Sequence, residues 1–67
     1  MVVETERYVY VVELKLSNNG GLAAAERQII ANSYLEPFRG GRRTVVGLAV
    51  ELDSEGKGLV DWKAVEE

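Results

Sequence analysis

The sequence predicts a small α/β domain of order β-β-α-β-β, in which one crossover helix joins two strands of a mixed sheet. Two runs rich in β-branched and apolar residues, 8–16 and 43–52, have the composition of strands. Helix-forming residues fill the segment between them, from Leu22 to about Leu35. Because a right-handed crossover through a helix joins parallel strands, we expect these two strands to be parallel.

Strand 8–16 gives the strongest signal in the chain. Its even positions are all apolar, whereas its odd positions change from valine at 9 and 11 to Glu13 and Lys15. A strand with this pattern is typical of the centre of a sheet, buried on both faces. We therefore expect charge to emerge near its C-terminal end, where the sheet would open into a site.

Two shorter strands complete the predicted sheet. Residues 1–4 form the first strand, and residues 59–65 form the last. The glycine-rich segment 53–58 is predicted to be a turn, which makes the last strand antiparallel to strand 43–52. Strand 43–52 carries its larger apolar residues on one face. Its opposite face carries small residues at 47 and 49, so a helix or another backbone can pack closely there.

The helix is predicted over about 21–36. Apolar residues at helical spacing form a stripe along it, and Pro37 disfavours helical geometry at Glu36. The stripe consists of Leu22, Ala25 and Ile29, with Ile30 and Tyr34 beside them.

The length of 67 residues allows a single domain, which buries only about 60% of the surface that its unfolded chain exposes. The chain has no cysteine and no histidine, which excludes disulfides, zinc sites of the Cys/His type and catalysis by either residue. A bound metal would need oxygen ligands, which suits Mg²⁺, Mn²⁺ or Ca²⁺.

A net charge of −3 disfavours a general coating of nucleic acid. A local basic patch is nevertheless present at Arg39, Arg42 and Arg43, which either contacts phosphate or is a solvated loop. Acidic and basic residues interrupt the N-terminus, and no apolar run approaches the length of a membrane span. We expect a soluble, cytoplasmic protein with no membrane partner.

Glu13 and Lys15 project from the same face of their strand because they are two residues apart. A carboxylate and an ammonium side by side on a rigid strand can hold a divalent metal and polarise a phosphate. The alternative is a solvated polar edge on an ordinary small sheet.

An ordered set of motifs resembles the PD-(D/E)XK nuclease superfamily. More narrowly, the chain is similar to the nuclease-like domain at the C-terminus of bacterial and archaeal AAA-ATPase-like proteins. The resemblance covers nearly the whole chain. The matching segments are Tyr10-Val11-Val12-Glu13-Leu14-Lys15-Leu16, Ala25-x-x-Gln28-Ile29, Tyr34-Leu35-Glu36-Pro37-Phe38, Val45-Val46-Gly47-Leu48-Ala49-Val50 and Asp61-Trp62-Lys63.

This resemblance implies a restriction endonuclease-like fold and metal-dependent hydrolysis of phosphodiester bonds, with Mg²⁺ or Mn²⁺ as cofactor. Glu13 would be a catalytic residue whose carboxylate binds the metal. Lys15 would stabilise charge on the phosphate or orient the attacking water. Gln28 would face the site, with Tyr34 in support. DNA or another nucleic acid would be the substrate of the parent domain, and Arg39, Arg42 and Arg43 would be candidates for contacting it.

One departure from the superfamily pattern is important. Relatives carry a metal-binding aspartate on the strand before Glu-x-Lys, and the first aspartate in this chain is Asp53. We therefore expect a partial domain, a fragment or remnant with an incomplete metal site that is inactive alone.

A non-enzymatic alternative remains open. A single helix covers one face of the predicted sheet, so a second copy or the rest of a larger domain would have to cover the other. The chain would then be a homodimerising or protein-interaction module on a nuclease-like scaffold. In this reading Gln28 is a solvated helix residue, Tyr34 and Phe38 belong to the core, and Trp62 covers the edge of the core.

Overall fold

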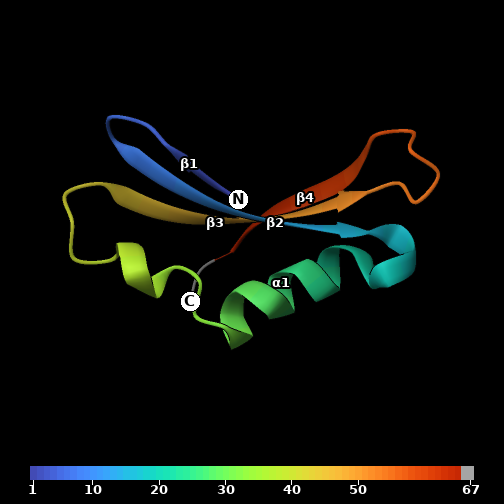
Figure 1. Cartoon of the computed structure of the whole chain (residues 1–67), viewed down its shortest axis with the longest axis horizontal. Helices are drawn as coiled ribbons and strands as arrows, with labels where there is room; N and C mark the ends of the chain where they lie inside the picture. Colours follow the sequence, from blue (N-terminus) through green and yellow to red (C-terminus); the bar gives the residue numbers. More distant parts are fainter. Residues whose placement is uncertain (66–67) are drawn as a thin grey trace.

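The computed structural model of the protein describes residues 1–65. One mixed four-stranded sheet, in the order β1-β2-β3-β4, carries helix α1 on one face (Figure 1). The predicted β-β-α-β-β arrangement is confirmed. The elements are β1 (Val2–Glu4), β2 (Tyr8–Leu16), α1 (Gly21–Ala31), β3 (Thr44–Leu52) and β4 (Leu59–Val65), with short 3₁₀ helices η1 (Ser17–Asn19) and η2 (Glu36–Phe38).

The pairings of β2 with β3 and of β3 with β4 follow the prediction. β2 and β3 are parallel over their full length, in a register that runs from Tyr8 opposite Thr44 to Leu16 opposite Leu52. β1 is antiparallel to β2, and β4 is antiparallel to β3 with an irregularity at Glu51 and Leu52. The crossover through α1 therefore places the C-terminal ends of β2 and β3 at the same end of the sheet.

The core lies between the sheet and α1. The odd-numbered side chains of β2 and β3 face the helix, whose buried residues Ala25 and Ile29 pack on them. The close approach of Ile29 and Leu35 to β3 depends on Gly47, because a Cβ atom there would lie 3.3 Å from Leu35 Cδ2 and 3.4 Å from Ile29 Cγ2. The buried cluster consists of Val9, Val11, Ala25, Ile29, Leu35, Ala49 and Val65.

The helix is shorter than predicted, because it ends at Ala31 rather than near residue 36. Ser33 adopts a left-handed conformation with φ of 50°. The backbone N–H of Ser33 donates to Ile30 O at 3.2 Å, and the N–H of Tyr34 donates to Ile29 O at 3.1 Å. This is the Schellman pattern of helix termination, so the chain turns away from the helix well before Pro37.

The opposite face of the sheet has no covering element within residues 1–65, so the expectation that β2 is buried on both faces is wrong for the described chain. We call this surface, formed by the even-numbered side chains of β2 and β3 with Val3 and Trp62, the open face. Trp62 is 59% exposed on it and does not cover the core. Ile30 is also outside the core, at 47% exposure.

No helix among residues 1–65 has both the length and the apolar character needed to cross a membrane.

Candidate functional site

Lys15 and Gln28 line the same hollow. Lys15 lies near the C-terminal end of β2, and Gln28 lies on α1, which runs back beneath the sheet. The hollow is open to solvent and measures about 520 Å³. Its other lining residues are Asn19, Ala24, Arg27, Ala31 and Asn32.

The charge of this hollow is positive. Lys15 and Arg27 both line it, and neither forms an ion pair within the described residues. Among residues 1–65 no carboxylate lines it, and the side-chain amides of Gln28 and Asn19 add hydrogen-bond donors, while that of Asn32 donates to Gln28 O at 3.1 Å. Two cations with neighbouring amide donors suit an oxyanion such as a phosphate.

Arg27 is a residue of this hollow that the sequence analysis did not select. A signal for it was present, because residues at i, i+3, i+4 and i+7 form one strip along a helix. Ala24, Arg27, Gln28 and Ala31 have this spacing and all line the hollow. Once Gln28 was a candidate, Arg27 on the same strip was one too.

Glu13 lies outside this hollow, although it shares a strand face with Lys15. It lines a second depression of about 280 Å³ together with Tyr34 and Phe38. Both aromatic residues also pack against the buried cluster, as the core interpretation of them predicted. The structure thus brings Lys15 together with Gln28, and Glu13 together with Tyr34, in two separate depressions.

Within residues 1–65, no three acidic side chains gather closely enough to hold a metal ion. Glu13 offers oxygen ligands of the type that Mg²⁺ and Mn²⁺ prefer, but it is a single carboxylate. Further ligands would have to come from substrate, water or another polypeptide segment.

The second half of β2 forms a free edge in the described structure. β1 pairs with β2 only from Val9 to Val11, so residues 13–16 have a partner strand on one side alone. This edge leaves Glu13 and Lys15 half-buried and accessible. The position also agrees with the alternative of a solvated polar edge, because charged residues on an edge strand discourage pairing with other chains.

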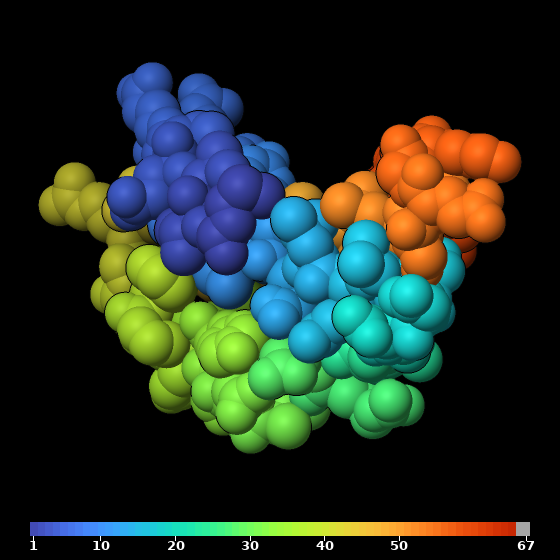
Figure 2. All heavy atoms as spheres, turned by 45° about the vertical axis from the view of Figure 1, so that its right-hand side comes forward, coloured from blue at the N-terminus to red at the C-terminus, as the bar shows by residue number. Residues whose placement is uncertain are grey.

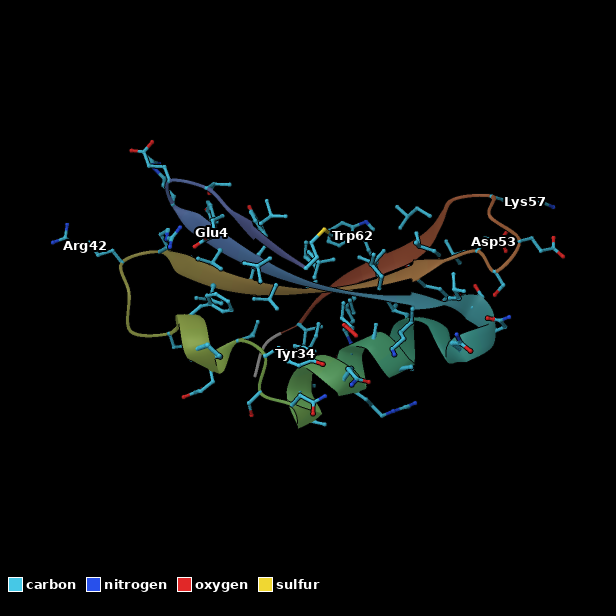
Figure 3. The ribbon with its side chains drawn as sticks, viewed as in Figure 1. Glu4, Tyr34, Arg42, Asp53, Lys57 and Trp62 are labelled. Carbon is cyan, nitrogen blue, oxygen red and sulfur yellow. The ribbon has the colours of Figure 1, made fainter. Side chains whose placement is uncertain are left out.

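The three arginines lie at the other end of the sheet, before β3 begins. Arg43 Nη2 pairs with Glu4 Oε1 at 2.8 Å, and Arg39 pairs with Glu36 at 3.6 Å. Arg42 projects from the far end of the molecule (Figure 3). The register of β2 and β3 separates this loop from Lys15 by most of a strand length. The candidate arginines and the Lys15 hollow therefore do not form one surface.

Glu51, on β3 opposite Lys15, fixes the start of the helix. Its Oε2 accepts a hydrogen bond of 2.6 Å from Ser17 Oγ, and its Oε1 accepts one of 2.9 Å from the backbone N–H of Leu22. These bonds, the Ser17 bond most strongly, lower the pKa of Glu51 below the ordinary glutamate range. Glu51 thereby holds α1 against the sheet where the hollow opens.

Comparison with known proteins adds no functional assignment. No protein-family model, no curated protein and no solved structure matches the chain. The shared hollow of Lys15 and Gln28 and the motif resemblance are therefore the two observations that bear on function.

Proposed function

We propose that the chain carries the phosphodiester-binding part of a metal-dependent nuclease site of the PD-(D/E)XK kind. The observation that supports this proposal is the hollow that Lys15 and Gln28 share. The motif resemblance assigns both residues to one site, although they are far apart in the sequence. A solvated polar edge gives no reason for the two side chains to converge.

In this proposal the Lys15 ammonium contacts a non-bridging oxygen of the scissile phosphate. Arg27 supplies a guanidinium that can hold the same phosphate or its neighbour through two hydrogen bonds. The Gln28 amide donates a further hydrogen bond and limits how the strand of nucleic acid can lie. These contacts bind and orient the substrate without a metal.

The hydrolytic step belongs to the parent domain in this proposal, because the superfamily pattern has a second metal-binding carboxylate, an aspartate before Glu-x-Lys, that this sequence lacks. Glu13 would provide one ligand to Mg²⁺ or Mn²⁺. A bound metal of this type lowers the pKa of its water and neutralises charge on the phosphate. We therefore expect phosphodiester binding from the isolated chain, and no cleavage.

A binding assay tests the proposal. Fluorescence anisotropy of a labelled single-stranded oligonucleotide, at low salt with Mg²⁺, would compare the wild type with Lys15→Ala and Arg27→Ala. Loss of one charge-assisted contact costs roughly 1.5–3 kcal/mol, so Lys15→Ala should weaken binding at least about tenfold. Binding of the wild type should also weaken as salt increases.

Lys57→Ala is the matched control. Lys57 is an exposed lysine in the turn after β3, where its side-chain ammonium pairs with Glu55 at 3.5 Å and its backbone N–H donates to Asp53 Oδ2 at 3.2 Å. Removing it changes the net charge as Lys15→Ala does, but leaves the hollow intact. Equal affinities of Lys15→Ala and Lys57→Ala would contradict the proposal.

A further inference from the structure

The open face lacks charge. All even-numbered residues of β2 and β3 are apolar or aromatic except Thr44. The charged residues of the central strands, Glu13, Lys15 and Glu51, have odd numbers and lie on the α1 side. The members of the open face are Val3, Tyr8, Tyr10, Val12, Leu14, Leu16, Thr44, Val46, Leu48, Val50, Leu52 and Trp62.

A continuous apolar row crosses this face. Leu14 on β2 is opposite Val50 on β3, and Val50 is opposite Trp62 on β4. Leu14 is 45% exposed and Trp62 is 59% exposed, so both ends of the row are open to solvent. Figure 3 shows Trp62 on the side of the sheet away from α1. A contiguous apolar patch of this kind marks an interaction site.

The shape of the face is a trough. The β1–β2 hairpin rises at one end of the sheet and the β3–β4 hairpin rises at the other (Figure 1). Figure 2 shows the N-terminal hairpin and the 53–60 hairpin standing apart, with residues of β2 between them. A second twisted sheet can pack into such a trough, with roughly 10 Å between the two sheets.

Charge decides which class of partner fits the open face. A nucleic acid or a strongly charged peptide would leave its charges without partners against an uncharged surface. The matching surface is one that is equally apolar and equally twisted. A second copy of the same open face has both properties, and a twofold axis makes the two surfaces self-complementary.

The extents of the molecule set an upper limit on the area of the open face. The Cα atoms extend 39 × 23 × 14 Å, and the face spans the longest and shortest of these directions (Figure 1). The whole molecule therefore projects onto about 550 Å² when viewed from this side, and a dimer interface would use most of that projection. Biological interfaces bury upwards of roughly 1,000 Å² in total, about 500 Å² on each partner.

We propose that two copies of the chain associate through their open faces, forming a two-sheet sandwich with the α1 helices outside. The Leu14–Val50–Trp62 row lies in the buried centre. The Lys15 hollow is on the α1 side of each sheet and stays accessible in this dimer. The proposal therefore does not depend on the phosphodiester-binding role.

Sedimentation at micromolar concentration tests this dimer. The wild type should sediment at twice the mass of one chain, and Trp62→Glu should raise the dissociation constant at least about tenfold, as expected for an aromatic interface anchor. Ile30→Glu is the matched control, because Ile30 is an apolar residue of 47% exposure on the helix layer. It should remain dimeric. A monomeric wild type, or a Trp62→Glu variant as dimeric as the control, would overturn the proposal.

A second measurement needs no variant. Trp62 is the only tryptophan of the chain, so its fluorescence reports on this face alone. As the wild type is concentrated through its association range, the emission should shift to shorter wavelength and acrylamide quenching should weaken. Emission and quenching that stay constant while the mass doubles would place the interface elsewhere and overturn the proposal.

Discussion

The Glu51 carboxylate on β3 accepts a 2.9 Å hydrogen bond from the backbone N–H of Leu22, in the first turn of α1. The first N–H groups of a helix have no partner within the helix, and a negative charge there is favourable. Glu51 provides both the acceptor and the charge from another element. This bond links the start of the crossover helix to the strand that follows it, and so sets how α1 lies beneath Lys15.

We predict that Glu51 makes the free energy of unfolding depend on pH in the acid range. Hydrogen bonds from Ser17 and Leu22 lower the pKa of Glu51 in the folded chain relative to the unfolded one. The resulting stabilisation is complete above the ordinary glutamate pKa of about 4.3, and is lost as pH falls through the lowered folded value. Urea unfolding from neutral to acid pH should show a smaller decline for Glu51→Gln than for the wild type.

Glu55→Gln serves as the control for that experiment. Glu55 is an exposed acid in the turn after β3, and its carboxylate pairs with Lys57 at 3.5 Å. Its variant should retain the wild-type dependence on pH. Identical acid profiles for Glu51→Gln and the wild type would show that the capping contact does not contribute.

Gly21→Ala should destabilise the fold through two effects. Gly21 has φ of 56°, and a Cβ atom there would lie 2.5 Å from Glu51 Oε1. Gly40 has φ of 90° but nothing within 4 Å of such an atom, so Gly40→Ala measures the backbone effect alone. We expect a loss of about 1 kcal/mol for Gly40→Ala and a clearly larger loss for Gly21→Ala by urea unfolding. Equal losses would contradict this account of Glu51.

Ser33→Gly should stabilise the protein. Ser33 has φ of 50° at the Schellman position that ends α1, where glycine adopts the conformation without steric cost. The expected gain is about 0.5–1 kcal/mol, which raises the melting temperature of a domain this small by several degrees. A lower melting temperature for Ser33→Gly would contradict the assigned helix end.

Truncation of two adjacent isoleucines should lower the free energy of unfolding by very different amounts. Ile29 is fully buried between α1 and the sheet, whereas Ile30 is 47% exposed. Ile29→Ala should cost about 2–5 kcal/mol and Ile30→Ala well under 1 kcal/mol in the free energy of unfolding. The pair tests which side of the helix faces the core. Similar losses at the two positions would contradict the described packing.

Much of the fold could be predicted because its signals are local. The alternation in β2 and β3 identified both strands, and small residues at 47 and 49 indicated a face for close packing, which the helix occupies. The end of the helix was missed because Ser33, which has no strong preference for the left-handed region, occupies the position where glycine is the usual signal. The exposure of Trp62 was missed because residue type does not reveal which face of a sheet is covered.

The candidate site could be predicted from the sequence less completely than the fold. The motif resemblance selected Lys15 and Gln28, which the structure brings to one hollow. Glu13 lines a different depression, and the arginine loop lies at the other end of the sheet. Glu51 could not be selected, because its role depends on a contact with a helix that begins thirty residues earlier.

Nuclear magnetic resonance titration of the ¹⁵N-labelled chain with a short single-stranded oligonucleotide tests the central proposal most directly. We predict that the largest shifts fall on the backbone amides around Lys15 and Arg27 and on the side-chain amide of Gln28. The same titration of Lys15→Ala should lose them. Shifts confined to residues 39–43, or no shifts in the hollow while the oligonucleotide is bound, would contradict the assignment of this hollow as the phosphodiester site.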